Sequence, residues 1–194
     1  MTPTPSRRAL IVVDVQPTFC EGGALGVAGG NAVAEAVAHY AHAHRDHYAL
    51  VATTQDWHIE PGSHFSETPD FVDTWPPHGV AGTAEAELHP ALADLNPQVS
   101  VKKGQYEAAY SGFEGTTADG QSLDAALRAA DISQVDVVGI AESHCVKETA
   151  LDALKNGYEV RVFTDLTVPV SAEQGAAARE QLAAAGVELA QSQR

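Results

Sequence analysis

The sequence predicts an α/β fold of three layers, α/β/α, with helices on both faces of a six-stranded, mostly parallel sheet. Short apolar runs recur along the chain without the alternation of a half-exposed strand, which indicates strands covered on both faces. Segments of helical periodicity separate these runs, as in a parallel sheet with helical crossovers. The predicted strands are residues 9–15, 49–54, 98–102, 135–140, 159–164 and 187–190.

Capping signals place the predicted helices between these strands. A polar N-cap residue precedes three of the helices, and a further helix over residues 144–156 follows the fourth strand. In the last helix, Ser171 and Gln174 match a capping box. The residues that carry the other signals are the N-caps Asn31 and Ser122 and the terminating glycines Gly157 and Gly186.

The length of 194 residues allows one domain with a substantial core and is too short to expect two, so residues 1–194 are expected to form a single domain. The chain has 26 acidic and 11 basic residues and a formal net charge of -15. Such a surface repels phosphate backbones, so we expect no nucleic-acid partner. The sequence is equally compatible with a monomer and a homo-oligomer.

The apolar segments are too short to cross a bilayer, and the start of the chain lacks a signal-peptide pattern, so we expect no membrane association. The two cysteines, Cys20 and Cys145, are too few for a disulfide framework. A reducing, cytoplasmic location is therefore expected, and each cysteine is judged as a thiol.

The segment from about residue 55 to residue 97 has no sustained helical or strand period and is rich in Pro, Gly, His and Trp. Long irregular segments in compact domains are usually functional or disordered. The tryptophans and histidines favour an ordered loop that covers a site. In parallel α/β sheets the site lies beyond the carboxyl ends of the strands, which selects Asp14, Asp56, Lys103 and the segment after Ile140.

A possible metal site lies in this loop. Asp56 and His58 are two residues apart, so in an extended chain both side chains point to the same side. A carboxylate with up to three imidazoles suits Zn, Fe(II) or Mn. The alternative is a set of surface histidines, since the chain uses histidine freely elsewhere. The candidate ligands are Asp56, His58, His64 and His78, and the other histidines include His39, His42, His44 and His47.

Cys145 follows an apolar strand and a turn and lies at the start of the predicted helix. Backbone N–H groups and the helix dipole at such a position stabilise a thiolate and can hold an oxyanion. The alternative is a small buried residue that packs the helix onto the sheet. Cys20 lies in a loop with no helix start after it, so we interpret it as a structural or incidental thiol.

Asp14 and Lys103 are the other candidates for chemistry. A lone acid at the end of an apolar strand is costly unless it is paired or used, so Asp14 is a candidate general base, or else a cap of the following loop. Lys103 could pair with Asp14 and a thiolate, or be a solvated lysine. Lys102 points to the opposite face, so only one of these two lysines can lie inside.

Eight segments, in order and spread over nearly the whole chain, make the sequence resemble the nicotinamidase/pyrazinamidase family of the isochorismatase-like cysteine hydrolases. Each segment alone is weak, whereas the ordered set is highly specific. The resemblance implies the Rossmann-like isochorismatase hydrolase fold. The matching segments are residues 9–23, 54–58, 63–65, 74–78, 103–104, 110–113, 137–141 and 144–146.

The resemblance also implies an Asp–Lys–Cys triad of Asp14, Lys103 and Cys145 that hydrolyses nicotinamide to nicotinate and ammonia, and pyrazinamide similarly. Cys145 would form a thioester, Asp14 would transfer the proton, and Lys103 would hold the charges. The backbone N–H groups of Ala141 and Cys145 would form the oxyanion hole, next to a cis bond between Ile140 and Ala141. Such an activity implies a role in NAD salvage and pyridine nucleotide biosynthesis.

One divalent metal ion, Zn, Fe or Mn, is implied at the four candidate ligands, where it would meet the ring nitrogen of nicotinamide. The family pattern places six residues around the substrate, three of which are aromatic walls of the flat ring. These six residues are Phe19, Trp75, Tyr110, Ile140, Ala141 and His144. The chain departs from the pattern at Ser143, where many relatives carry an acid two residues before the cysteine, although Glu142 is adjacent.

Two other functions are compatible with parts of this pattern. One is another hydrolase on the same scaffold, an N-carbamoyl amidase or an isochorismatase, but these relatives generally lack the pattern of Asp56, His58 and His78. The other is a metal-binding or ligand-binding module without catalysis, against which the presence of Asp14, Lys103 and Cys145 argues.

Overall fold

The computed structural model describes residues 7–193 and confirms the predicted sheet. Its six strands lie in the order β3-β2-β1-β4-β5-β6, and each pair of neighbours is parallel. Residues 1–6 and 194 of the expected domain lie outside the described residues. The strands are β1 (Arg8–Val13), β2 (Leu50–Asp56), β3 (Val99–Lys103), β4 (Gln134–Ile140), β5 (Glu159–Val168) and β6 (Glu188–Ala190).

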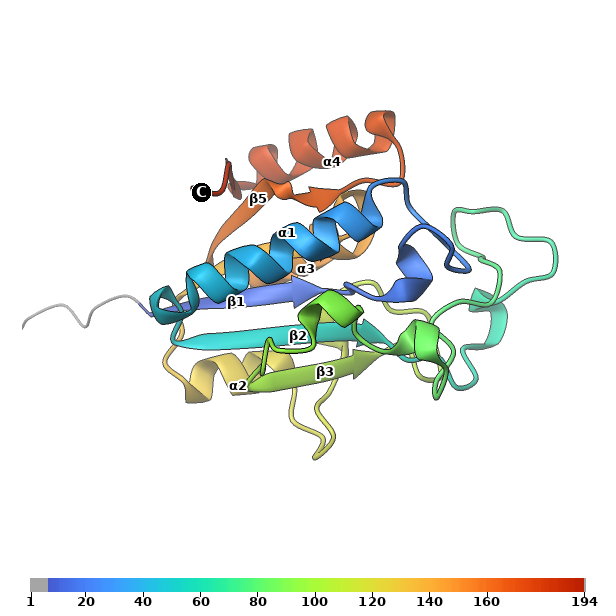
Figure 1. Cartoon of the computed structure of the whole chain (residues 1–194), viewed down its shortest axis with the longest axis horizontal. Helices are drawn as coiled ribbons and strands as arrows, with labels where there is room; N and C mark the ends of the chain where they lie inside the picture. The colour runs from blue at the N-terminus through green and yellow to red at the C-terminus, as the bar shows by residue number, and fades with distance from the viewer. Residues whose placement is uncertain (1–6, 194) are drawn as a thin grey trace, which may run out of the picture.

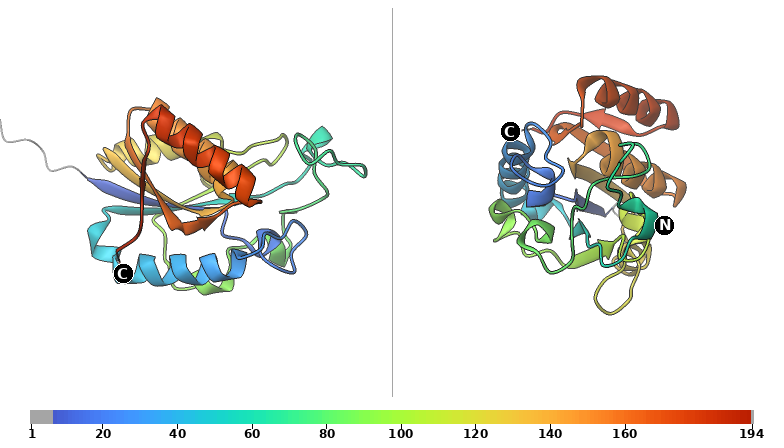
Figure 2. Two further views of the ribbon diagram at one scale, coloured as in Figure 1. Left: turned by 90° about the horizontal axis from the view of Figure 1, so that it is seen from above. Right: turned by 90° about the vertical axis from the view of Figure 1, so that its right-hand side faces the viewer.

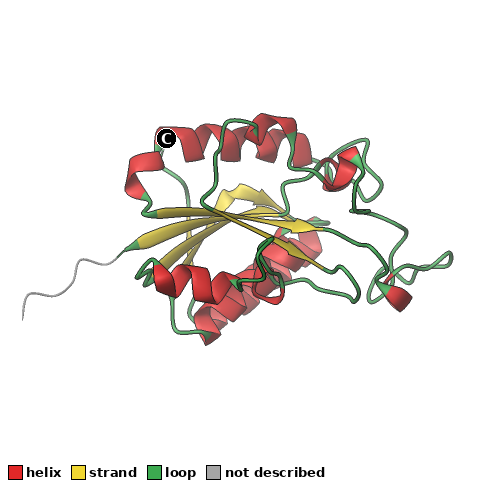
Figure 3. Ribbon diagram, turned by 90° about the horizontal axis from the view of Figure 1, so that it is seen from below, coloured by secondary structure: helices red, strands yellow, loops and turns green. Residues whose placement is uncertain are grey.

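Helices cover both faces of this sheet (Figures 1 and 3). Successive residues of β1 show why, because Leu10 and Val12 pack in the apolar cluster on one face while Ile11 and Val13 pack in the cluster on the other. The first cluster includes residues of one helix, and the second includes residues of the other three. These helices are α1 (Gly30–Ala43) on the first face and α2 (Leu123–Ala129), α3 (Lys147–Lys155) and α4 (Ala172–Ala185) on the second.

The predicted helix ends are mostly confirmed. The Ser122 side chain accepts a hydrogen bond from Ala125 N, and Ser171 accepts one from Gln174 N. A capping box would also need a bond from the Ser171 backbone N–H to the Gln174 side chain. The Gln174 side chain instead accepts from the Ser171 hydroxyl, 3.2 Å away, so the capping box is not reproduced. Two glycines with positive φ follow the ends of α3 and α4 as predicted, Gly157 and Gly186.

The predicted N-cap at Asn31 is wrong. Helix α1 begins at Gly30 with Gly29 as its N-cap, two residues earlier than a cap at Asn31 requires. The carboxylate of Glu21 accepts hydrogen bonds from the backbone of Gly29 and Asn31, at 2.6 and 2.8 Å. A side chain from the preceding loop therefore satisfies the first N–H groups of the helix, and Asn31 pairs with His89 instead.

The chain after β4 also differs from the prediction. It first forms one π-helical turn, Glu142–Val146, and α3 begins only at Lys147. Val146 N donates to Ala141 O at 3.1 Å, the wider ring that defines such a turn. Helical structure therefore begins two residues before the predicted helix over 144–156, whereas the α-helix itself begins three residues after the predicted start. The peptide bond between Ile140 and Ala141 is cis, as expected.

The end of β4 approaches β1 closely at Gly139. A Cβ atom at this position would lie 2.1 Å from Val13 O, and the φ of Gly139 is +120°. Only glycine fits there. The pairing of β4 with β5 shifts register between Val137 and Gly139, whereas the pairing of β4 with β1 is regular up to Gly139.

The first part of the long connection between β2 and β3 lies beyond the carboxyl ends of the strands, and its last part runs back along the sheet to the start of β3 (Figures 1 and 2). Isolated bridges between His58 and Val80 and between Phe65 and Trp75 tie its two arms together. Short 3₁₀ turns occupy part of its length. None of the helices within residues 7–193 has the length and apolarity that a membrane crossing requires.

Candidate active site

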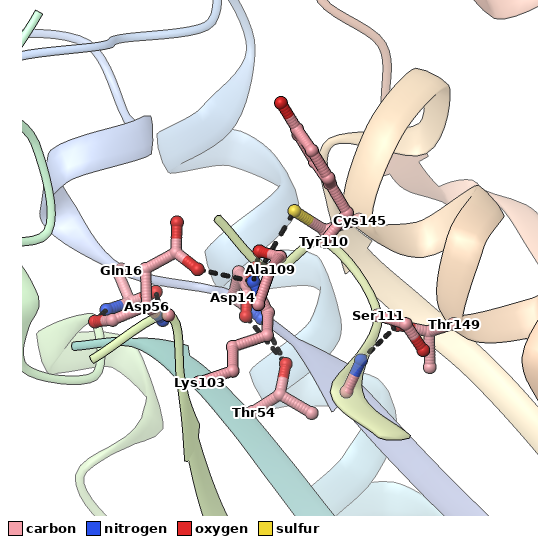
Figure 4. Close-up of polar contacts among 12 residues, drawn as sticks. Asp14, Gln16, Thr54, Asp56, Lys103, Ala109, Tyr110, Ser111, Cys145 and Thr149 are labelled. Atoms are coloured by element: carbon pink, nitrogen blue, oxygen red, sulfur yellow. Dashed lines mark hydrogen bonds and ion pairs between the residues drawn. The ribbon is translucent and has the colours of Figure 1, made fainter. Parts of the chain in front are cut away.

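Four buried polar side chains meet at the carboxyl ends of four neighbouring strands (Figure 4). Asp14 follows β1, Asp56 ends β2 and Lys103 ends β3, while Cys145 lies in the π-helical turn after β4. The parallel sheet brings these strand ends to one edge, which is the position expected from the sequence.

Lys103 is buried at the centre of this group. Its Nζ lies 2.9 Å from Asp14 Oδ2, forms an ion pair with Asp56 and donates to Ala109 O at 3.2 Å. The same Nζ lies 3.7 Å from Cys145 Sγ. Burial alone lowers the pKa of Lys103, but the two carboxylates raise it well above its ordinary value. Lys103 is therefore a fixed positive charge between two acids and a thiol.

Lys102 lies on the opposite face, as the alternation of the strand requires. Its Nζ is 3.3 Å from the centre of the Trp57 ring. Of the two adjacent lysines, Lys103 is the internal one.

Asp14 is held rigidly beside Lys103. Thr54 Oγ1 donates to Asp14 Oδ1 at 2.6 Å, and Asp14 N donates to Thr54 O at 3.1 Å. Burial raises the pKa of Asp14, Lys103 and Thr54 oppose this effect, and the charge of Asp56 adds to it. A carboxylate whose pKa is raised accepts a proton more readily, which suits a general base.

Cys145 is only 8 % exposed and borders a cavity. Burial raises the pKa of its thiol, Lys103 opposes the shift, and the charges of Asp14 and Asp56 add to it. This corrects the expectation of a stabilised thiolate, because the two buried acids and the loss of water outweigh the lysine. The direction of this shift favours the thiol form over the thiolate, with the carboxylate of Asp14 close to it.

Cys20 is fully buried, and burial followed by the charge of Glu21 raises the pKa of its thiol to about 11. Its side chain does not border the Cys145 cavity. Both cysteines are free thiols. These properties agree with the interpretation of Cys20 as a structural thiol.

Three buried histidines from the long connection form a cluster beside Asp56. One ligand atom from each of His58, His64 and His78 lies within 4.8 Å of the others. Asp56 Oδ2 is 3.4 Å from His58 Nε2 and 3.6 Å from His78 Nε2. The structure thus brings together the four residues that the sequence suggested as ligands.

The outer nitrogens of two histidines are fixed by main-chain carbonyl groups. His58 Nδ1 is 2.5 Å from Gly104 O, and His78 Nδ1 is 2.8 Å from Pro76 O. Such contacts orient the opposite Nε2 atoms, as is usual for histidines that bind metals. Within residues 7–193, His58 Nε2 and His64 Nδ1 have no hydrogen-bond partner although both are buried. Buried nitrogens without partners are what a metal would satisfy.

The charge states of the cluster also suit a divalent ion. Burial, followed by the charges of His58 and His78, lowers the pKa of His64 to about 4, so its ring is neutral near pH 7. Burial alone raises the pKa of Asp56, but Lys103 and the imidazoles hold it well below its ordinary value. Imidazole nitrogens together with a carboxylate form a donor set for a first-row divalent metal.

A cavity of about 230 Å³ joins the histidine cluster to Cys145. Trp75 Nε1 donates to the Tyr110 hydroxyl at 3.1 Å, and the Trp75 and His144 rings meet edge to face at 5.7 Å between centroids. A larger hollow of about 440 Å³ beside α1 is lined by none of the candidate site residues. The candidate residues that line the smaller cavity are Phe19, Asp56, His64, Trp75, His78, Tyr110, Ala141, His144 and Cys145.

Ile140 does not line this cavity. Its side chain is fully buried in the core cluster on the α1 face. Successive residues of a strand point to opposite faces, so the end of β4 directs Ile140 into the core. The Ile140 side chain therefore does not contact the substrate as expected, and only the main chain of Ile140 could do so.

Several residues of the site were not found from the sequence. Gln16 is fully buried, and its side-chain amide forms two hydrogen bonds with the backbone of Asp56. Gln16 Nε2 donates to Asp56 O, and Gln16 Oε1 accepts from Asp56 N, each at 2.9 Å. Gln16 lies two residues after Asp14 in an apolar segment, which is a signal that could have marked it. The additional cavity-lining residues are Leu25, Gly26, Val27, Phe71, Ala109, Val170 and Gln174.

Comparison with known proteins adds independent support. The sequence profile of the isochorismatase domain matches residues 8–194. A nicotinamidase/pyrazinamidase of Mycobacterium tuberculosis is 50 % identical over 182 residues, which cover 94 % of this chain and 97 % of the relative.

Two solved structures are similar over almost their whole length. A pyrazinamidase of Pyrococcus horikoshii in complex with zinc superimposes with a TM-score of 0.84 and 35 % identity, covering 96 % of this chain and 99 % of that one. The PnC1 protein of L. infantum in complex with nicotinate has a TM-score of 0.82 and 33 % identity, covering 98 % and 96 %. The chain therefore belongs to the nicotinamidase/pyrazinamidase family of isochorismatase-like hydrolases.

Proposed function

We propose that this protein hydrolyses nicotinamide to nicotinate and ammonia, and pyrazinamide to pyrazinoate in the same way. The observation that carries the proposal is that Cys145 and the histidine cluster border one cavity of about 230 Å³ with aromatic walls. A flat aromatic amide fits this arrangement, with its carboxamide at the thiol and its ring nitrogen at the histidines. The M. tuberculosis relative has both activities in its name, and the P. horikoshii protein is named a pyrazinamidase.

The reaction begins at Cys145. Its Sγ attacks the carboxamide carbon while Asp14 accepts the thiol proton, and Asp14 then donates this proton to the departing nitrogen, so that ammonia leaves and a thioester remains. In the second half, Asp14 takes a proton from water as the water oxygen attacks the thioester. As the C–S bond breaks, Asp14 gives this proton to Sγ, and the product leaves as nicotinate after its carboxyl group loses its own proton to solvent.

Lys103 and two backbone groups support these steps. The ammonium of Lys103 lies 2.9 Å from Asp14 Oδ2 and 3.7 Å from Cys145 Sγ, where it stabilises the negative charge that passes between them. The backbone N–H groups of Ala141 and Cys145 are assigned to the oxyanion of the tetrahedral intermediate. Both residues border the cavity.

The divalent metal, Zn, Fe or Mn, would be held by Asp56, His58, His64 and His78. When bound, it supplies a Lewis acid that anchors the ring nitrogen directly or through water. The ring itself would lie among Phe19, Trp75, Tyr110 and His144, whose side chains exclude water from the carboxamide.

We further propose that residues 1–194 form one domain and that the reaction serves NAD salvage in the cytoplasm. Both cysteines are free thiols, which agrees with a reducing compartment. The isochorismatase profile extends to the last residue of the chain, which supports one domain.

Ammonia release from three amides tests the proposed reaction. Protein purified without a His tag should turn over nicotinamide and pyrazinamide. With benzamide, which has the same shape and lacks the ring nitrogen, kcat/KM should fall about 100-fold or more because the anchor that positions the carboxamide is lost. Equal values for nicotinamide and benzamide would contradict recognition of the ring nitrogen, and no ammonia from nicotinamide would overturn the proposed function.

A further inference from the structure

The carboxylate of Glu142 is fully buried, although the chemistry described above does not use it. Glu142 is the first residue of the π-helical turn that carries Cys145. A buried acid is unfavourable unless its partners compensate it. The partners of the Glu142 carboxylate therefore indicate what this side chain stabilises.

Glu142 has one partner on β5 and another on α4. The Thr167 hydroxyl donates to Glu142 Oε2 at 2.7 Å, and Arg179 Nε lies 3.0 Å from Glu142 Oε1. Within residues 7–193, Oε1 has no hydrogen bond of good geometry, so the positive charge of Arg179 is its main compensation. One carboxylate thus ties the turn to two separate elements.

The surface of α4 is shaped for this contact. A Cβ atom at Gly175 would lie 3.1 Å from Glu142 Oε1 and 2.7 Å from Pro169 Cγ, so a side chain at this position would push the helix away from the turn. A second link is the Ser143 hydroxyl, which accepts from Val170 N at 3.2 Å. Two consecutive residues of the turn are therefore held, Glu142 against α4 and Ser143 against the segment that precedes α4.

The same part of the chain supplies one wall of the cavity. Val170 and Gln174 line it on the side of α4, and Cys145 lines it from the turn. A link between turn and helix therefore sets the distance between the nucleophile and this wall.

We propose that Glu142 is a positioning residue for the reaction, holding the π-helical turn so that Cys145 stays beside Lys103 and at the border of the cavity. The inference rests on the proposed function in so far as Cys145 is the nucleophile. A displacement of about 1 Å in a reacting group can lower the rate about 100-fold. The interaction of Glu142 with Arg179 and Thr167 acts on catalysis only through the placement of Cys145.

Steady-state kinetics on four variants test this role at matched metal content. Glu142→Gln offers one acceptor oxygen and turns an N–H₂ group towards a donor, so kcat for nicotinamide should fall about 10- to 100-fold with KM within about threefold. Arg179→Met should lower kcat in the same direction. The double variant should lose no more than the more affected single variant, because the two residues act as a pair.

Arg128→Met is the matched control, since Arg128 is an exposed residue of α2 that pairs with Asp124 at 2.8 Å and donates to Asn156 O, at the end of α3 away from the turn. Its kcat should equal that of the wild type. A folded, metal-loaded Glu142→Gln with kcat within about twofold of the control would overturn the proposal. If Glu142→Gln does not fold, Arg179→Met decides by the same criterion, because the Arg179 side chain is 46 % exposed and the Glu142 carboxylate keeps the hydrogen bond from Thr167 when Arg179 is replaced.

The alkylation of Cys145 by iodoacetamide separates this inference from the proposed function, because it needs no amide substrate. Its rate constant should differ several-fold between Arg179→Met and Arg128→Met. Equal rate constants would overturn the positioning role even if the wild type hydrolyses nicotinamide. A wild type that releases no ammonia, with different alkylation rates in the two variants, would overturn the proposed function and support the positioning role.

Discussion

The carboxylate of Asp56 forms an ion pair with the ammonium of Lys103. This ion pair links the two parts of the site, because Asp56 contacts the histidine cluster and Lys103 contacts Cys145. Asp56 Oδ1 faces Lys103, while Asp56 Oδ2 faces His58 and His78. The order of the sheet explains this arrangement, since Asp56 and Lys103 are register partners at the ends of β2 and β3. Changes to the cluster and changes to the triad should therefore affect each other.

The first prediction concerns metal content. His58→Ala should lose most of the bound metal, because it removes a ligand whose orientation is fixed by Gly104 O. Elemental analysis of protein purified without a His tag should show near-stoichiometric metal in the wild type. His39→Ala, a change at an exposed residue of α1, is the control and should retain the metal. Full retention in a variant that lacks both His58 and His78 would contradict the assigned site.

The second prediction concerns the two adjacent lysines. Lys103→Ala leaves the buried carboxylates of Asp14 and Asp56 without their cation, so the free energy of unfolding should fall by about 3 kcal/mol or more. Lys102→Ala removes only a partly exposed contact with Trp57 and should change it by less than about 1 kcal/mol. Urea unfolding of both metal-loaded variants gives the comparison. Equal losses of stability would show that Lys103 does not hold these charges together.

The third prediction follows from the raised pKa of the Cys145 thiol. Since only the thiolate is alkylated, the iodoacetamide rate constant should be low at neutral pH and rise about tenfold per pH unit, without a plateau up to about pH 9. Cys145 should still react before Cys20, because it borders the cavity and Cys20 is fully buried. Nicotinamide should protect Cys145.

Mass spectrometry of the labelled peptides distinguishes the two thiols. A rate constant that already reaches its plateau below about pH 7 would reveal a preformed thiolate and contradict the sign of the pKa shift. The same profile in Cys20→Ala shows that the measured thiol is Cys145.

The fold was predictable because its strands are apolar on both faces, and each apolar run in the sequence corresponds to a strand. The convergence of Asp14, Lys103 and Cys145 followed from one rule about strand ends. Helix starts were harder to predict where the partner is remote in the sequence. Glu21 satisfies the N–H groups at the start of α1 from outside the helix, a contact that no local pattern at Asn31 reveals.

The charge relationships of the site were less predictable than its residues. The sequence suggested that Cys145 is a thiolate at a helix start, but the turn is π-helical and two buried acids lie nearby, which reverses the expected direction of its pKa. Such a balance depends on distances between side chains from different strands. The two partners of Glu142 likewise come from later parts of the chain.

Ammonia release by two single-cysteine variants tests the central claim most directly. Cys145→Ala, at the same metal content as the wild type, should release no ammonia from nicotinamide above background, because no other thiol borders the cavity among the described residues. Cys20→Ala should keep most of the activity. An active Cys145→Ala together with an inactive Cys20→Ala would contradict the account of this protein as a hydrolase that uses Cys145.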